Sequence, residues 1–400
     1  MSDGTGQNRQ RPSRAKGTMV KFAPHAPRSA RSTQSHLVPS TRTRTRGVAV
    51  LAALTAATAL GAAGCSSSSA AGSAAGGTGV SLILKTLSNP YFVTMENDAK
   101  AEAAKDGVSL TVAAGTSDGD TQTQIAAIDD AISRGDKGIL ITTNGNAVNA
   151  ALNQAKQAGL YVIALDTAPT PASVADITYA TDNTAAGKLD GQAAAATLGG
   201  KKAVIAMLDL YSTQVVSVDI DRDHGFLEGM GIDPGSSTEN GQEAKTGSYS
   251  GGGSYQIACQ QPTQGAVDGG RTAMEDCLSA NPSINVVYAI NEPAAEGAYA
   301  ALKAANRTNV KIYAIDGSCT GMQDVASGEF AADAVQYPGK MASLGVDSIA
   351  KLAKGGSKPQ VSSGLDFYDT GTALVTASPV SGVTGETVAQ GQAACWGSTS

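Results

Sequence analysis

From Val80 onward, short runs of β-branched and aliphatic residues alternate with longer alanine-rich stretches whose apolar residues recur at helical spacing. The first series predicts strands at VSLILKT, VSLTVAA, KGILITT and LYVIALD, with helices over residues 91–106, 121–133 and 147–158. A second series predicts strands at KKAVIAML, NVVYAI and KIYAID, with helices over residues 219–230, 265–280 and 293–305. This alternation predicts an α/β fold with two doubly wound lobes, each built on a mostly parallel sheet.

The first 64 residues have a different pattern. Ten Lys or Arg residues and one acid, Asp3, precede an uninterrupted small and apolar stretch over residues 47–64. Basic residues followed by such a stretch are typical of an export signal, which we assign to residues 1–64. A retained membrane helix is the alternative, because a stretch of this length can span a bilayer.

Cys65 follows the small residues AAG, which resemble the processing box of bacterial lipoproteins, although leucine is usual at the position of Ala62. Residues 66–79 are almost entirely Ser, Ala and Gly, a composition typical of flexible tethers. We therefore expect a lipid on Cys65, a flexible linker over residues 65–79, and a protein anchored outside the cytoplasmic membrane.

The whole chain has 35 acidic and 29 basic residues, and ten of the basic ones lie in the head, so the remainder is strongly acidic. Such a surface repels nucleic acid, and no nucleic-acid partner is expected. The chain lacks CxxC and any His-rich set of metal ligands, so neither a metal nor another cofactor is predicted.

Four cysteines follow the linker: Cys259, Cys277, Cys319 and Cys395. An even number in an exported protein favours disulfides, although spacing alone leaves their pairing open. We predict Cys259–Cys277, which closes a short local loop, and Cys319–Cys395, which ties the C-terminal tail to the loop after Asp316.

Polar side chains follow the predicted strands, at the edge where ligands bind in such sheets. Asn89, Tyr91 and Phe92 come after the first strand and Asp166 ends the fourth, while the second series ends in Asn291, Asp316 and Gln336. Amides and carboxylates bridge neighbouring hydroxyls, and aromatic rings cover the C–H face of a sugar. The set therefore suits a neutral polyol.

Each of these residues also has a purely structural interpretation. Asn89 before Pro90 suits a helix cap, and Asp166 and Asp316 suit loops. Tyr91 and Phe92 would serve equally as core residues of a helix, and Arg222 as a solvated charge. Their joint placement favours a binding site.

Long segments, among them SNPYF, YATDNTAAGKLDGQ, AIDGSCTG and QYPGKMASLG, carry a family resemblance that spans residues 80–397. The chain resembles the ribose-type (type I) periplasmic sugar-binding proteins, and most of all the fructose-type substrate-binding proteins of ABC transporters. The resemblance implies two lobes joined by a three-crossing hinge, a monosaccharide ligand, a permease partner and no enzymatic activity. It places residues 80–182 and 337–365 in the first lobe and 183–336 and 366–397 in the second.

The resemblance also implies the sugar contacts. In the first lobe they are Asn89, Tyr91, Phe92 and Asp166; in the second they are Arg222, Asn291 and Asp316, with Gln336 at a crossing. Two departures stand out, because Thr167 replaces an arginine of the ribose-type proteins and Gly265 replaces a third aromatic, whose place Gln264 would take. These changes favour another pentose or hexose, with fructose as the leading candidate.

Three other functions fit the sequence less well than sugar binding. Residues 115–119 match the G-x-S-x-G pattern of serine hydrolases, but a triad needs a histidine and the mature chain has only His224. A sugar-responsive regulator would need a helix-turn-helix where the export signal stands. An amino-acid binder would use Arg222 with Asp166 or Asp316 and is the strongest alternative. The glycine-rich GSYSGGGS is expected to be a flexible surface loop, and the protein a monomer.

Overall fold

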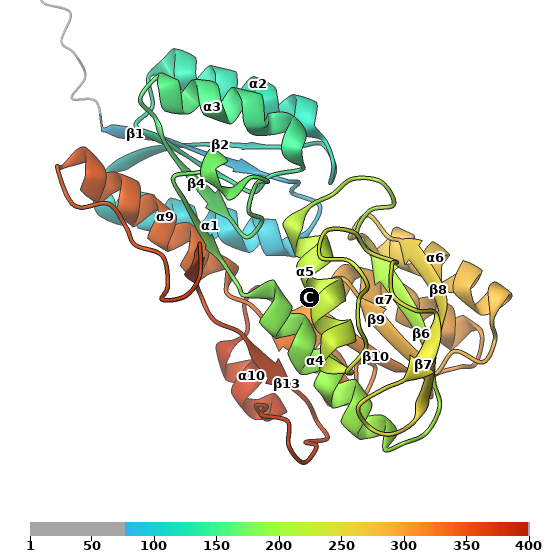
Figure 1. Ribbon diagram of the computed structural model, residues 1–400. Coiled ribbons are helices and arrows are strands. Elements are labelled where there is room, and N and C mark those ends of the chain that lie inside the picture. Colours follow the sequence, from blue (N-terminus) through green and yellow to red (C-terminus); the bar gives the residue numbers. More distant parts are fainter. Residues whose placement is uncertain (1–76, 399–400) are drawn as a thin grey trace, which may run out of the picture. The chain divides into compact units, whose positions relative to one another are not determined.

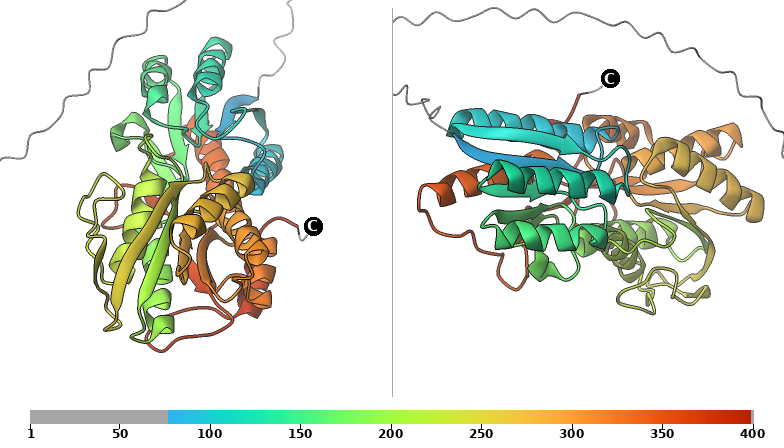
Figure 2. Two further views of the ribbon diagram at one scale, coloured as in Figure 1. Left: turned by 90° about the vertical axis from the view of Figure 1, so that its right-hand side faces the viewer. Right: turned by 90° about the horizontal axis from the view of Figure 1, so that it is seen from above.

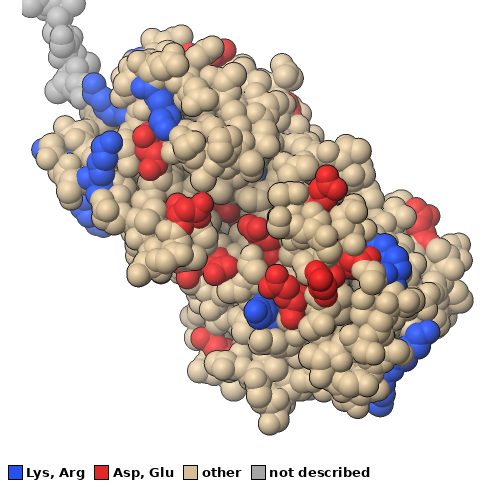
Figure 3. All heavy atoms as spheres, viewed as in Figure 1, with Lys and Arg blue, Asp and Glu red and all other residues tan. Residues whose placement is uncertain are grey.

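A computed structural model describes residues 77–398, all of which belong to one compact unit. The predicted signal segment, Cys65 and most of the predicted linker lie outside these residues. Among the helices of the described part, none combines the length and the apolar character that a membrane crossing requires. On the face shown in Figure 3, acidic side chains gather across the middle, with most lysine and arginine side chains toward the edges.

The first lobe is a parallel six-stranded sheet with the order β12-β5-β4-β3-β1-β2. Helices α2 and α3 cover one face, and α1 and α9 cover the other (Figure 1). Its elements are β1 (Thr78–Leu84), α1 (Pro90–Asp106), β2 (Val108–Ala114), α2 (Thr121–Arg134), β3 (Gly138–Ile141), α3 (Asn149–Gln157), β4 (Tyr161–Leu165), β5 (Ile177–Ala180), α9 (Pro338–Ala353) and β12 (Tyr368–Asp369).

The second lobe is a seven-stranded sheet with the order β13-β11-β10-β9-β6-β8-β7, antiparallel only at β7 and β13. Figure 2 shows helices on both faces of each sheet. Its elements are α4 (Asn183–Leu198), β6 (Ala203–Asp209), α5 (Ser217–Gly229), β7 (Thr246–Ser248), β8 (Ser254–Pro262), α6 (Val267–Ala280), β9 (Val286–Ala289), α7 (Glu292–Ala304), β10 (Lys311–Asp316), α8 (Cys319–Ser327), β11 (Ala332–Val335), β13 (Ala373–Val375) and α10 (Val388–Ala394).

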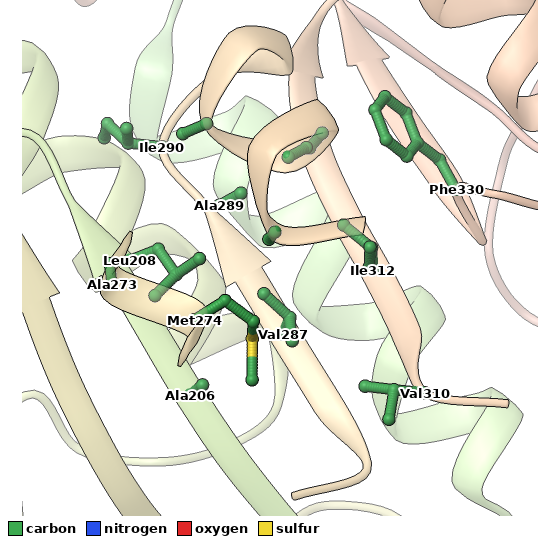
Figure 4. Close-up of a cluster of buried hydrophobic side chains, with 14 of the residues drawn as sticks. Ala206, Leu208, Ala273, Met274, Val287, Ala289, Ile290, Val310, Ile312 and Phe330 are labelled. Carbon is green, nitrogen blue, oxygen red and sulfur yellow. The ribbon is translucent and has the colours of Figure 1, made fainter. Parts of the chain in front are cut away.

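The core of the second lobe shows why the alternation of the sequence folds in layers. Side chains from β6, β9 and β10, such as Leu208, Val287 and Ile312, meet Met274 of α6 and Phe330, and all five are almost fully buried (Figure 4). The other sheet face packs against α4 and α5. Because helices cover both faces of the sheet, its strands are apolar along their whole length. The predicted α/β fold class is confirmed.

The predicted helices are present, with ends set by local chemistry. The Asn89 side chain accepts a hydrogen bond from the Tyr91 amide at 2.9 Å, Pro90 follows, and Gly107 (φ 70°) ends α1. The helix expected from residue 265 begins two residues later, because Gly265 has φ 62° and lies outside helical backbone. GSYSGGGS contains the end of β7, a turn over residues 249–253 and the first residue of β8, so the predicted surface loop is the turn of a hairpin in which Ser248 pairs with Ser254.

The chain passes between the lobes three times. The passages are the segments β5–α4, β11–α9 and β12–β13, with Gln336 at the second. The predicted boundary after residue 365 comes too early, because Tyr368 pairs with Tyr179 of the first sheet. Residues 366–369 therefore belong with the first lobe.

Both disulfides have the predicted pairing. Cys259 of β8 is bonded to Cys277 of α6, with their Cα atoms 5.4 Å apart. Cys319 of α8 is bonded to Cys395, which follows α10, with their Cα atoms 4.9 Å apart. Both separations lie in the usual range for disulfides, so both bridges stabilise the second lobe.

Candidate functional site

A small pocket lies between the lobes, at the carboxyl ends of strands from both sheets. Its volume is about 30 Å³. All eight residues predicted to contact the ligand line it: Asn89, Tyr91, Phe92, Asp166, Arg222, Asn291, Asp316 and Gln336. The structure thus brings together side chains that are far apart in sequence and come from both lobes and one crossing.

Tyr91 and Asp166 form the first-lobe side of the pocket. The Tyr91 hydroxyl donates to Asp166 Oδ1 at 3.0 Å and lies 3.3 Å from Gln336 Oε1. Burial, together with Asp166 and Asp316, raises the pKa of Tyr91, so this hydroxyl keeps its proton. Asp166 has φ 63°, a strained backbone for a residue with a side chain, and such strain concentrates at functional sites.

Arg222 is held from three sides and is only 5% exposed, so its interpretation as a solvated charge is wrong. Nε donates to Asn183 Oδ1 at 2.7 Å, Nη1 donates to the Ile290 carbonyl at 2.9 Å, and Nη2 lies 3.8 Å from Asp166 Oδ1. Burial lowers the pKa of Arg222, but Asp166 and Asp316 raise it by more, so the guanidinium stays charged.

Close packing of α4 against α5 sets the position of Arg222. A Cβ on Gly187 of α4 would overlap the Arg222 carbonyl oxygen, and a Cβ on Gly225 of α5 would overlap the Thr184 carbonyl. Glycines at these contacts let the two helix backbones approach, which turns the Arg222 side chain toward the pocket lined by Asp166.

Asp316 forms the second-lobe side of the pocket, at the end of β10. Its Oδ1 accepts from Gln336 Nε2 at 2.7 Å, and its Oδ2 accepts from the Glu292 amide at 3.3 Å. Burial, followed by the nearby Glu292 carboxyl, raises the pKa of Asp316 to about 8. Near neutral pH, Asp316 is therefore largely protonated, and its carboxyl can both donate and accept hydrogen bonds.

Asn89 and Asn291 each cap a helix and also line the pocket. Asn89 caps α1, and Asn291 Oδ1 accepts from the Ala294 amide at 3.0 Å and so caps α7. Asn291 Nδ2 donates to the Gly265 carbonyl at 3.1 Å. The capping interpretation is therefore right for Asn89, although both residues also line the pocket.

Five pocket residues were not predicted: Lys85, Asp118, Leu210, Val218 and Ile290. Lys85 is 3% exposed, and its Nζ lies 3.8 Å from Asp166 Oδ2 and 6.0 Å from the centre of the Phe92 ring. Asp166 therefore lies between two cations. The available signal was a lysine directly after a buried apolar strand, a position where lysine is seldom buried without a partner.

Asp118 lies within the segment that matched the hydrolase pattern. The Tyr211 hydroxyl of the second lobe donates to Asp118 Oδ1 at 3.3 Å, so this first-lobe loop contributes to contact between the lobes. Neither Ser117 nor His224 lines the pocket, and His224 Nε2 lies 3.2 Å from the Glu239 carbonyl oxygen. The arrangement does not support a catalytic triad.

A wider groove of about 910 Å³ shares Asn89, Asp118 and Asp316 with the pocket. Gln264, the expected substitute for a missing aromatic, lines this groove and not the pocket, and its contact with the sugar stays a prediction. Its backbone has φ 57° and directs the chain into the turn before α6.

Away from the pocket, Glu102, Asp106 and Asp347 lie close enough together to share a cation, with their nearest oxygens within 4.8 Å of one another. All three are partly exposed, and Lys105 Nζ already binds Glu102 Oε1 at 2.7 Å. The cluster is therefore accounted for as a surface charge group.

Comparison with known proteins identifies one family. Residues 80–357 match the model of the periplasmic binding protein domain. The ribose import binding protein RbsB of Haemophilus influenzae is 31% identical over 277 residues, covering 69% of this chain and 86% of that protein. The D-apiose import binding protein of Actinobacillus succinogenes is 29% identical over 280 residues, covering 70% and 83%.

Among solved structures, an ABC transporter solute-binding protein from Mycobacterium smegmatis with bound glycerol is similar to this chain. The two are 28% identical with a TM-score of 0.66, and the match covers 81% of this chain and 99% of that one. Sequence and fold therefore agree on the same kind of protein.

Proposed function

The chain belongs to the periplasmic binding protein domain family, and from that premise we propose that it captures a monosaccharide outside the cytoplasm for an ABC importer. It is a binding protein and not an enzyme. The observation that carries the proposal is the set of side chains able to bind hydroxyls that both lobes and a crossing direct into one pocket. The pocket, about 30 Å³ in this arrangement, has to widen to admit a sugar.

The pocket chemistry fits a sugar. Asp166, Asp316 and Asn291 offer oxygens and an amide that can hold vicinal hydroxyls, and Arg222 and Lys85 supply charged donors. The Tyr91 and Phe92 rings, whose centres are 5.2 Å apart, provide an apolar surface for the C–H face of a ring.

Ribose itself is a poor candidate, because Thr167 and Gly265 stand where ribose-type proteins have an arginine and an aromatic. We propose fructose or another pentose or hexose. Relatives with this fold are described as import proteins for ribose and D-apiose, and one solved structure contains D-allose.

A thermal-shift screen with D-fructose, D-ribose, D-allose, D-apiose and a set of L-amino acids tests this proposal. A ligand at 100 times its dissociation constant adds about 2.7 kcal/mol of stability, which produces a clear rise in melting temperature. We expect one sugar to stabilise the protein. Stabilisation by an amino acid alone, or by no compound, would contradict the proposal.

We also propose that the mature protein is a monomer anchored through lipid-modified Cys65, with the permease as its partner. The basic head, the apolar stretch and the Ser-rich tether of the sequence support this anchor. Cell fractionation of wild type and Cys65→Ala tests it. The variant should leave the membrane fraction, whereas full retention would indicate an uncleaved helix.

A further inference from the structure

The C-terminal tail connects the second lobe to the first beside the proposed sugar pocket. The tail follows α10, which packs on α8, and Cys395 at the end of α10 is bonded to Cys319 at the start of α8. The next residue, Trp396, is the only tryptophan of the chain. The tail is thus covalently held to the second lobe immediately before this residue.

Trp396 is fixed to the loop that carries Asp316. Its indole Nε1 donates to the Asp316 carbonyl at 3.0 Å, and its own carbonyl accepts from the Cys319 amide at 2.9 Å. A backbone bridge also joins Trp396 to Ser318. Two hydrogen bonds and the neighbouring disulfide therefore hold the indole in one orientation relative to Asp316.

The indole ring itself contacts the other lobe. Its centre lies 5.4 Å from that of Tyr91, with the rings edge to face at 79°, and it packs against the first-lobe core cluster. The Tyr91 hydroxyl donates to Asp166 within the pocket, so Trp396 supports a pocket residue from behind. Trp396 lines the wider groove and is not among the residues of the pocket.

We propose that the disulfide-held tail is an interlobe clasp, in which Trp396 positions Tyr91 and Asp316 and stabilises the closed arrangement of the lobes. This inference rests on the proposed sugar-binding function. If the lobes separate, a tail anchored to the second lobe carries Trp396 away from Tyr91, so the contact belongs to the closed form. Ligand affinity depends on the population of the binding-competent form, so loss of the clasp raises the dissociation constant.

A set of variants distinguishes the contribution of the Trp396 side chain from that of the disulfide that holds the tail. Trp396→Ala removes the ring and the indole donor, whereas Trp396→Phe keeps a ring against Tyr91 and removes only the donor. Cys319→Ser/Cys395→Ser releases the tail with Trp396 intact. Cys259→Ser/Cys277→Ser is the matched control, because it removes the other disulfide of the same lobe, whose cysteines do not line the pocket.

Isothermal titration with the tightest-binding sugar of the screen provides the test. Trp396→Ala and Cys319→Ser/Cys395→Ser should each bind about tenfold more weakly, as expected for loss of an aromatic pair with its packing. Trp396→Phe should recover most of the affinity, and the control pair should match wild type even where its melting temperature falls. Wild-type affinity in Cys319→Ser/Cys395→Ser, or an equal loss in the control, would overturn the clasp.

A second measurement needs no ligand and keeps the clasp testable apart from the proposed function. Excitation of the single tryptophan reports its surroundings, and acrylamide should quench it weakly in wild type and more strongly in Cys319→Ser/Cys395→Ser. Equal quenching in both would show that the disulfide does not hold Trp396 in place and would overturn the proposal. Failure of every sugar to bind wild type would instead refute the sugar-binding function.

Discussion

The two lobes have the same α/β layering, but their buried acidic side chains have different partners. In the first lobe, Asp136 accepts from Ser81 at 2.6 Å and Arg134 at 3.1 Å, and Asp166 lies between Lys85 and Arg222. In the second lobe, both carboxylate oxygens of Asp190 have no hydrogen-bond partner among the described residues, and Asp223 lies beside the carboxyl group of Asp209. Burial raises the pKa of Asp190 well above the usual range, and burial together with Asp209 and Asp219 does so for Asp223.

Several buried acids of the second lobe lie together near the end of β6. Burial, followed by Asp219, raises the pKa of Asp209 to about 8, and burial raises the pKa of Asp219 to about 6. Asp223 lies beside them. The second lobe therefore folds with protons on buried acids and with both disulfides, whereas Asp136 and Asp166 of the first lobe are paired with cations. Its stability should respond to pH and to reduction more strongly than that of the first lobe.

Removal of the disulfides should have the largest effect. The bridges span 18 and 76 residues, and closing loops of these lengths restricts the unfolded chain by about 3 and about 4 kcal/mol. Reduction with dithiothreitol should lower the melting temperature of the second lobe and separate the unfolding of the lobes in calorimetry. A single unfolding transition whose temperature does not change with reductant would show that the second lobe does not depend on its disulfides more than the first lobe does.

Isosteric replacements of one acid in each lobe should have opposite effects. A raised pKa stabilises the fold below the unfolded pKa of about 4, and this contribution is lost as pH rises toward about 8. Asp209→Asn should therefore stabilise the protein at pH 8 by about 1–2 kcal/mol, with little effect at pH 4. Denaturant unfolding at both pH values measures this change.

Asp136→Asn is the matched variant in the first lobe. It weakens hydrogen bonds from Ser81 and Arg134, so it should destabilise the protein by about 1 kcal/mol at pH 8. If both variants shifted stability in the same direction, the proposed difference between the lobe interiors would be wrong.

A smaller effect is expected at Lys85, the cation of the first-lobe strand end. Lys85→Met keeps most of the side-chain volume but leaves Asp166 with Arg222 as its nearby cation. Sugar affinity should fall about five- to tenfold, as for loss of one hydrogen bond of typical net strength, because Arg222 remains as a charged donor. Titration calorimetry measures it, and Lys100→Met on the exposed side of α1 is the control that should bind normally.

The sequence predicted much of the fold because strands covered on both faces are continuously apolar. It did not predict α4, whose contact face contains Gly187 and Gly191 in place of large apolar residues, so helical spacing is weak. Gly187 also contacts the backbone of Arg222, a residue that only the family resemblance had selected. GSYSGGGS was predicted only as a surface loop, because the pairing of Ser248 with Ser254 on either side of its turn depends on the sheet edge and not on local composition.

The site shows the same limit. The rule that ligands bind at the carboxyl ends of strands was enough to predict Asp166, Asn291 and Asp316. Lys85 and Asp118 were missed because their importance comes from Asp166 and Tyr211, partners distant in sequence. Trp396 reaches Tyr91 only through the disulfide and the fold of the tail, so no local pattern marks its position.

The most direct test of the account is titration calorimetry of the cognate sugar with Asp316→Ala and Arg222→Ala, beside Ser117→Ala as control. Hydrogen bonds from the charged Arg222 contribute about 1.5–3 kcal/mol, and loss of the Asp316 carboxyl leaves sugar hydroxyls buried and unpaired at a cost of about 1–3 kcal/mol. Each of these two variants should therefore bind about tenfold to a hundredfold more weakly. Ser117 lines the neighbouring groove and not the pocket itself, so alanine there should leave the affinity close to that of wild type. Wild-type affinity in both Asp316→Ala and Arg222→Ala would show that the sugar binds elsewhere.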